Sequence, residues 1–136
     1  IAADTGICAG SLLDAHIEKI AKRKDGAIAG GCGEAWWIVA FLEWFKNGGE
    51  MPHISGDGVC STAITIDKRR KVTLYESEKD KTRVYVIKAP YHALGAGRSI
   101  ALGAMYAGAH PVDAVKAAMT HNDSTFGKVQ QFKVGW

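Results

Sequence analysis

Asp4 and Lys19 are the two ionisable residues whose types and positions could bring a carboxylate and an ammonium group together. Each lies in a segment that we expect to be a strand, Ile1–Asp4 and Ile17–Lys22. Their side chains could therefore meet across neighbouring strands of an N-terminal hairpin. An exposed cross-strand ion pair contributes only ~0.5 kcal/mol to stability. On the residues alone, the pair is more simply structural than catalytic.

The common catalytic and ligand-binding motifs do not occur in the sequence. It contains no G-x-S-x-G elbow, P-loop, H-E-x-x-H pair or EF-hand loop. Gly95-Ala96-Gly97 precedes an expected helix, but no G-x-G-x-x-G is completed and no lysine follows to reach a phosphate. The five histidines lack metal-ligand spacing. We therefore expect neither a metal nor a cofactor.

Composition and charge indicate an ordinary globular protein. A chain of 136 residues suffices for a single domain that buries ~68% of its unfolded surface. The net charge is only +3, and the basic residues are spread along the chain apart from Lys22–Lys24, so no nucleic-acid partner is expected. Three widely spaced cysteines without a C-x-x-C motif indicate reduced thiols and a cytoplasmic location. No apolar run reaches the ~18 residues of a membrane span, and no signal peptide is evident.

The N-terminal half predicts strands followed by one helix. Gly10 and Ser11 favour a turn, Lys24-Asp25-Gly26 favours a hairpin, and Ala27–Gly33 is expected as a short strand. Glycines inside a strand weaken it unless another backbone or a ligand approaches closely. Glu34–Lys46 is expected to be a helix, because apolar residues recur at i, i+3, i+4 and i+7 as Ile38, Phe41, Leu42 and Phe45. Helical spacing also predicts a core position for Trp36, Trp37 and Trp44, with a subunit interface as the alternative for some of them.

The C-terminal half predicts strands, two helices and a final strand. Alternating residues and charged turns indicate strands at Cys60–Asp67, Lys71–Glu76 and Thr82–Lys88, with a short one at His92–Leu94. The first helix presents small residues at Ala101, Ala104 and Gly108, and the second, from Pro111, a buried stripe of Val112, Val115 and Met119. Lys128–Val134 is the last expected strand. This order suits an α+β fold in which two antiparallel sheets pack face to face with helices outside. A small nucleotide-binding domain would instead need a parallel sheet.

Four segments in this order carry a family resemblance: Ile1–Gly6, Ile17–Ile20, Ala27–Gly33 and Leu94–Val115. Together they resemble the proteasome-like N-terminal-nucleophile (Ntn) hydrolases, in particular HslV-type bacterial peptidases and short bacteriophage-encoded relatives. The resemblance spans nearly the whole chain. It implies a four-layer αββα sandwich and a threonine peptidase that needs no cofactor. It further implies peptide or protein substrates, a homo-oligomeric ring and a possible ATP-dependent unfoldase as partner.

The resemblance also implies roles for three residues. In this family a threonine becomes the mature N-terminus, attacks the peptide carbonyl through its side-chain oxygen, and uses its own α-amino group as general base. The residue matching Lys19 lowers the pKa of the nucleophile and of the amine, and the one matching Asp4 orients that lysine. The backbone N–H matching Gly30 forms the oxyanion hole, with a one-residue ambiguity toward Gly31.

The sequence departs from the family pattern at the nucleophile. Ile1 cannot act as a nucleophile, and the family places its threonine roughly a dozen residues earlier, about one strand and turn. We therefore expect residues 1–136 to be a single Ntn domain that lacks its first strand. Thr5, Cys8 or Ser11 could serve only if processing exposed them, and cleavage there would remove Asp4.

Two supporting groups also differ from the family pattern. Ala96 stands where the family has the serine of a Gly-Ser-Gly turn. In the family's Asp-x-x-Ser/Thr-Gly element, Asn122 takes the aspartate position, Asp123 comes one residue late, and Thr125 matches the Ser/Thr. Thr125 and Asp123 are thus the expected supporting residues. The changes leave two functions open, a threonine peptidase subunit and a catalytically inactive structural or assembly subunit of the same fold.

Overall fold

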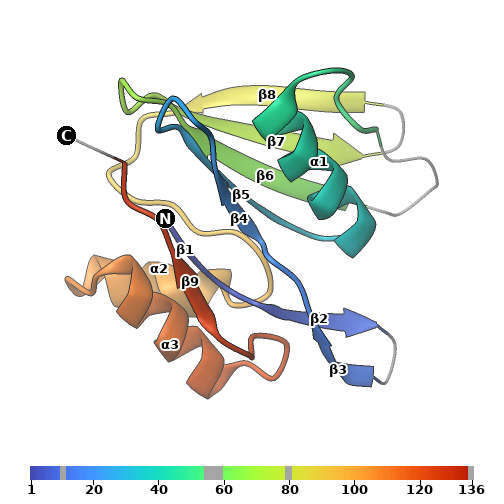
Figure 1. Ribbon diagram of the computed structural model, residues 1–136. Coiled ribbons are helices and arrows are strands. Elements are labelled where there is room, and N and C mark those ends of the chain that lie inside the picture. Colours follow the sequence, from blue (N-terminus) through green and yellow to red (C-terminus); the bar gives the residue numbers. More distant parts are fainter. Residues whose placement is uncertain (10–11, 54–59, 79–80, 135–136) are drawn as a thin grey trace.

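The computed structural model describes residues 1–9, 12–53, 60–78 and 81–134 (Figure 1). The strands of this described part are β1 (Ala2–Asp4), β2 (Gly6–Ala9), β3 (Leu12–His16), β4 (Ile20–Lys22), β5 (Ile28–Cys32), β6 (Cys60–Ile66), β7 (Val72–Glu78), β8 (Lys81–Ile87) and β9 (Val129–Gln131). The helices are α1 (Ala35–Asn47), α2 (Arg98–Tyr106) and α3 (Pro111–His121). The predicted order of strands, helix, strands, two helices and strand is confirmed.

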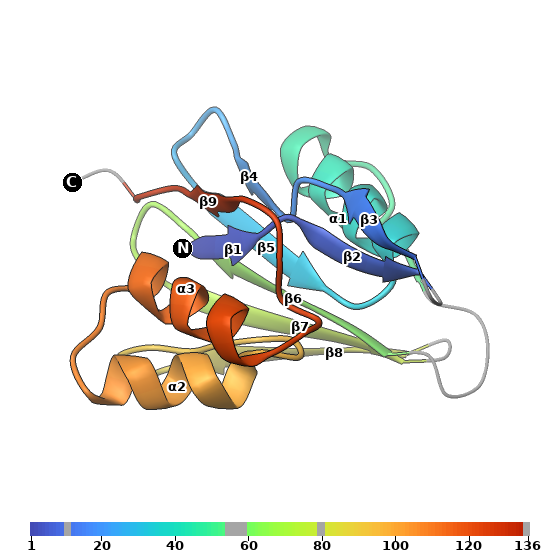
Figure 2. The same cartoon turned by 90° about the horizontal axis from the view of Figure 1, so that it is seen from below.

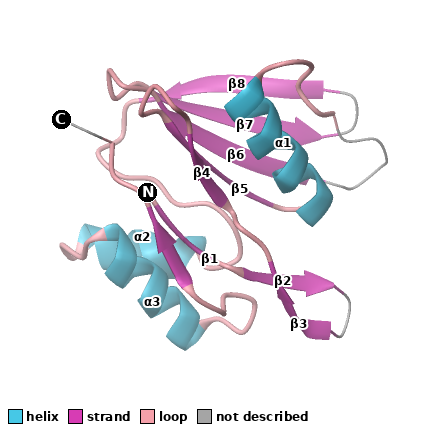
Figure 3. Cartoon of the chain, viewed as in Figure 1, coloured by secondary structure: helices cyan, strands magenta, loops and turns pink. Residues whose placement is uncertain are grey.

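The larger sheet is antiparallel, with the strand order β4-β5-β6-β7-β8 (Figure 3). The hairpin predicted at Lys24-Asp25-Gly26 joins β4 to β5, and the N–H of Arg23 donates to the carbonyl of Ala27 across it. The three strands predicted after Cys60 are present as β6, β7 and β8. The strand predicted at His92–Leu94 is wrong, because this segment is a loop. It follows Pro90, which lacks the N–H that a sheet ladder requires.

The smaller sheet pairs the two ends of the chain, with β1 antiparallel to β9. The last strand is shorter than predicted, because the three residues Ala2–Asp4 pair with Val129–Gln131 alone. A separate hairpin joins β2 to β3, and the turn predicted at Gly10 and Ser11 lies outside the described residues. The strand predicted over Ile17–Lys22 is wrong in its first half, since β4 begins only at Ile20.

The elements form four layers (Figures 1 and 2). Helix α1 packs on one face of the large sheet over β4, β5 and β6. The β1–β9 sheet lies on the other side, and α3 packs on it with α2 alongside. The predicted α+β architecture of two antiparallel sheets with outer helices is therefore confirmed.

Helix α1 supplies most of the core on its side of the sheet. Trp37 and Phe41 are fully buried and stack with their ring centroids 5.0 Å apart, and Trp44 is partly buried beside them. Trp36 is 52% exposed, so its predicted core position is wrong. One residue along a helix turns a side chain by about 100°, which takes Trp36 off the face that contacts the sheet. The helix extends one residue beyond its predicted end at Lys46, to Asn47, with Gly48 as its C-cap.

Small residues dominate the contact of α3 with its neighbours. Ala114 and Ala118 are its fully buried residues, whereas the predicted stripe of Val112, Val115 and Met119 is only half-buried. The reason is close approach: a Cβ built on Gly97 would lie 2.7 Å from the Cβ of Ala118. Only the smallest side chains fit at this distance.

The small face predicted on the first helix is shorter than expected. Ala101 is buried and Ala104 half-buried. Gly108 lies beyond the end of α2, with φ at +98°. Among the described residues, no helix is long and apolar enough to cross a lipid bilayer.

Candidate active site

Asp4 and Lys19 form an ion pair between the two sheets. Asp4 ends β1 and Lys19 directly precedes β4, and Lys19 Nζ lies 2.9 Å from Asp4 Oδ1. Both side chains are only 13% exposed. The second carboxylate oxygen, Oδ2, accepts a hydrogen bond from the N–H of Phe126 at 3.1 Å. Both oxygens of Asp4 are therefore engaged, which fixes the carboxylate and the ammonium group it holds.

The backbone of Lys19 is fixed from two sides. Its N–H donates to Oε1 of Gln130 on β9 at 3.0 Å. Its carbonyl accepts from the N–H of Gly31 on β5 at 2.9 Å. The lysine thus lies in a short connection bonded to both sheets, which explains its ordered position outside a strand. Lys19 contacts Asp4, as the sequence predicted. The two residues do not lie on one hairpin as expected, because β1 pairs with β9 and β4 pairs with β5.

Gly30 lies beside this pair on β5, opposite Ile20 and Ile64 in the sheet register. A Cβ built on Gly30 would lie 2.8 Å from Ile1 Cδ1, 3.0 Å from Ile20 Cγ2 and 3.4 Å from the carbonyl oxygen of Lys19. Any side chain at this position would collide with its neighbours. The glycine therefore allows the close approach of other groups next to Lys19.

A second cluster holds the turn after α3 against the turn before α2. The Asn122 amide nitrogen donates to the carbonyl of Ala96 at 3.3 Å, and its Oδ1 accepts from the Thr125 hydroxyl at 3.2 Å. Thr125 is 8% exposed, whereas Asp123 on the same turn is exposed to solvent. The turn continues into Phe126, whose N–H binds Asp4. The structure therefore connects Thr125 to the ion pair and leaves Asp123 at the surface.

Sequence reasoning missed the groups that hold the site together. Gln130 and the N–H of Phe126 lie more than 100 residues from the residues they bind. Thr5 and His16 were also missed as a pair: the Thr5 hydroxyl lies 3.1 Å from His16 Nδ1 and accepts from the N–H of Lys128 at 2.9 Å. These contacts depend on the β1–β9 pairing, and no motif in the sequence marks them.

The neighbouring Cys32 is unsuited to be a nucleophile. Burial raises the pKa of its thiol to about 11, and the positive charge of Lys19 only partly opposes this rise. The thiol therefore stays protonated near neutral pH, and a protonated thiol is a weak nucleophile. The side chain of Cys8 and the whole of Ser11, also considered as nucleophiles, lie outside the described residues. No group of three or more His, Cys, Asp or Glu residues in the described ranges could hold a metal ion.

Comparisons with known proteins support the fold. No protein-family model and no curated protein sequence matches the chain. Among solved structures, the chain is similar to eukaryotic HslV from Trypanosoma brucei, with a TM-score of 0.66 and 13% sequence identity. The match covers 95% of this chain and 88% of that chain. At this identity the likeness establishes the architecture alone: the chain has the fold of HslV, a proteasome-like Ntn hydrolase.

Proposed function

We propose that the chain is a threonine-type N-terminal-nucleophile peptidase subunit whose nucleophile is supplied by residues before Ile1. The proposed domain is 1–136 completed by that preceding strand. The threonine hydroxyl oxygen attacks the peptide carbonyl carbon and its proton passes to the free α-amine. The N–H of Gly30 stabilises the oxyanion, the α-ammonium returns the proton to the leaving amine, and water then hydrolyses the acyl-enzyme.

The observation that carries this proposal is the fixed Asp4–Lys19 pair. Two charged side chains that are each 13% exposed pay a desolvation cost that an exposed pair avoids. The backbone of Lys19 lies next to Gly30, where a Cβ would be 3.4 Å from the Lys19 carbonyl oxygen. A positive charge held at such a position lowers the pKa of a neighbouring hydroxyl and amine, which is what an N-terminal nucleophile requires. The HslV-like fold agrees with this assignment.

A second candidate function is a catalytically silent subunit of the same fold. It is favoured by the cluster at the turn before α2, where Ala96 contributes its carbonyl and has no hydroxyl to offer. Asn122, at the register of the family's aspartate, supplies an amide instead of a carboxylate. The hydroxyl and the carboxylate that would support the nucleophile's amine are thus replaced by a methyl group and an amide. The retained ion pair opposes this second candidate.

The wider setting follows from the resemblance to HslV-type and phage-encoded subunits. We propose a cytoplasmic protein that acts on peptides or unfolded proteins and assembles as a homo-oligomeric ring. An ATP-dependent unfoldase is the proposed partner that delivers substrates to it. The exposed Trp36 and Val39, on the outer face of α1, are candidate residues for contacts between subunits. Sedimentation of the purified protein tests the assembly.

The first experiment is N-terminal sequencing with intact mass on the natural mature protein. A threonine about a dozen residues before Ile1 supports the peptidase, and a mature chain beginning at Ile1 leaves the silent subunit. The second experiment measures hydrolysis of a fluorogenic peptide by the mature protein and its variants. Lys19→Ala should abolish turnover while leaving the assembly intact, whereas Lys116→Ala, an exposed change on α3, should leave turnover unchanged. Full turnover in Lys19→Ala would exclude the proposed mechanism.

A further inference from the structure

Basic residues that are separate in the sequence gather at one end of the large sheet. The pairing register of the sheet places one residue of each strand in a single row at this end: Lys22, Ile28, Ile66, Val72 and Ile87. The β4–β5 turn, the β6–β7 turn and the end of β8 therefore lie side by side. We call this region the basic end. Its cations are Lys22, Arg23, Lys24, Lys68, Arg69, Arg70, Lys71 and Lys88. These are eight of the 17 Lys and Arg residues, and the same two turns contain two carboxylates, Asp25 and Asp67. The small net charge of the chain therefore conceals a strongly positive surface.

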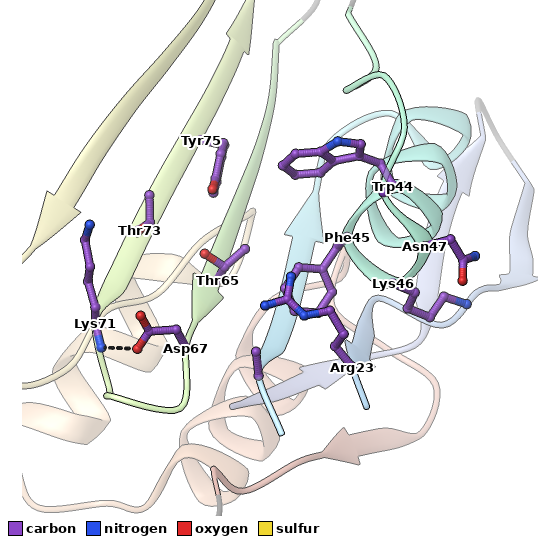
Figure 4. A pocket seen from close by; sticks show the side chains of 12 residues that line it. Arg23, Trp44, Phe45, Lys46, Asn47, Thr65, Asp67, Lys71, Thr73 and Tyr75 are labelled. Atoms are coloured by element: carbon purple, nitrogen blue, oxygen red, sulfur yellow. Dashed lines mark hydrogen bonds between the residues drawn. The ribbon is translucent and has the colours of Figure 1, made fainter. Parts of the chain in front are cut away.

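A partly apolar groove of about 550 Å³ adjoins the basic end. In Figure 4, Trp44 and Phe45 at the end of α1 face Thr65, Thr73 and Tyr75 of the sheet across it. The groove forms because α1 packs mainly on β4, β5 and β6 and reaches β7 through the contacts of Phe41 and Trp44 with Tyr75. Arg23 and Lys71 line it where it meets the basic end.

The apolar surface continues from the groove onto β8. Val84 is paired with Tyr75 and Val86 with Thr73, and paired residues point to the same face of a sheet. Val84 is 55% exposed and Val86 53% exposed. Two neighbouring valines on an edge strand that remain half in solvent indicate a surface that can still gain from burial.

The aromatic rings of the groove are packed against one another and do not suit the stacking of nucleic-acid bases. Trp44 meets Tyr75 edge to face at 6.0 Å and is tilted against Phe41 at 5.3 Å. The Arg23 guanidinium covers the ring of Phe45 at 4.8 Å. Single-stranded nucleic acids bind aromatic side chains by stacking on open ring faces. An apolar side chain of a polypeptide needs only a surface of matching shape, which this groove offers.

A second copy of the chain is a poor occupant, because its net charge is +3 and helices α2 and α3 offer few carboxylates. Helix α2 has no acidic residue and α3 has one, Asp113. On β7, Glu76 lies opposite Arg83 and Glu78 opposite Lys81 in the β7–β8 register. A second copy would therefore offer only scattered carboxylates to the basic end.

We propose that the basic end and its groove bind an acidic segment of another protein that carries apolar anchor residues. The cations pair with the acidic side chains of this segment, and its apolar side chains enter the groove and cover Val84 and Val86. Desolvated apolar anchors surrounded by complementary charge are the usual arrangement of a specific interface. The proposal stands whether or not the chain is a peptidase.

The probe for the test is a synthetic 16-residue peptide of Glu and Asp with four Leu and Phe anchors, labelled with fluorescein. Its affinity is measured by fluorescence anisotropy at about 50 mM salt, where charge effects are strong. Lys68→Glu/Arg69→Glu should weaken binding by about tenfold or more. The matched control, Lys116→Glu/Lys128→Glu, has the same charge change at exposed positions on α3 and directly before β9, and binding should stay within about twofold.

The groove is tested separately with Val84→Ser/Val86→Ser, whose fold is checked by circular dichroism. This variant should bind the anchored peptide more weakly, while its affinity for polyglutamate of equal charge should not change. Equal binding of polyglutamate and the anchored peptide to the natural protein would overturn the role of the groove. Tighter binding of a single-stranded oligonucleotide than of the peptide would overturn the proposed partner. Self-association that is lost in Lys68→Glu/Arg69→Glu would instead assign the surface to a second copy.

Discussion

The ion pair of Asp4 and Lys19 gives a quantitative prediction for stability. Asp4→Ala removes a charge-assisted hydrogen bond to Lys19, worth about 2 kcal/mol, and the acceptor of the Phe126 N–H, worth about 1 kcal/mol. The expected loss in the free energy of unfolding is therefore about 3 kcal/mol. In urea, with a slope near 2 kcal/mol per molar, the midpoint should fall by about 1.5 M.

A double-mutant cycle separates the pair from the other contacts of Asp4. Lys19→Met keeps most of the volume of the side chain and removes its charge. The combined variant should be less destabilised than the sum of the single variants by about 2 kcal/mol, against 0.2–1 kcal/mol for an exposed pair. Asp4→Asn, which can still accept from Phe126, should recover about 1 kcal/mol relative to Asp4→Ala. A coupling energy below about 0.5 kcal/mol would refute the argument that burial makes this pair strong.

Gly97→Ala should lower the free energy of unfolding by about 1–3 kcal/mol, because the new methyl would lie 2.7 Å from a side chain of α3. Gly103→Ala, in open space on α2, should raise the free energy of unfolding by about 0.5–1 kcal/mol. Urea unfolding of both variants measures the two effects. In a variant whose other two cysteines are replaced by serine, the rate at which Cys32 reacts with a thiol reagent should rise about tenfold per pH unit from pH 8 to 10. The rate should reach no plateau in this range, because the pKa of the thiol is about 11. A plateau below pH 9 would contradict the burial of Cys32. The hydrogen bond from Arg23 lowers the pKa of Asp25 to about 2, so the stability from this pair is present above about pH 4 and is lost as the pH falls toward 2. NMR titration should show the pKa of Asp25 rising in Arg23→Gln while staying below its ordinary value, because the N–H of Ala27 still donates to the carboxylate.

The large elements could be predicted from the sequence because their signals are local. Alternating residues between charged turns identify β6, β7 and β8, and the 3.6-residue period identifies α1. The same period could not distinguish Trp36 from Trp37, since a broad apolar stripe does not fix which edge meets the sheet. On α3 the larger apolar residues were expected inside, but close approach to Gly97 selects Ala114 and Ala118.

The sequence named the candidate site residues Asp4, Lys19, Gly30 and Thr125, from expected strands and from the family resemblance. It also named Asp123, which is exposed to solvent. The bonds that hold them depend on tertiary register, as with Gln130, which reaches Lys19 because β9 pairs with β1. The basic end was invisible for the same reason, since its cations come from separate turns of the chain.

The altered turn residues affect chemistry more than architecture. Asn122 reaches the turn before α2 through the carbonyl of Ala96, a group that every residue provides, so the missing serine hydroxyl does not break this contact. The Asn122 side chain also accepts from Thr125 and from the N–H of Ser124, as a carboxylate would. The turn therefore keeps its place, and with it the Phe126 N–H that fixes Asp4. What is lost is a hydroxyl and a negative charge near the proposed nucleophile. On the peptidase hypothesis, restoring them with Ala96→Ser and Asn122→Asp should raise turnover. Asn122→Asp also removes the donor to the Ala96 carbonyl, so the free energy of unfolding should fall by about 1–2 kcal/mol.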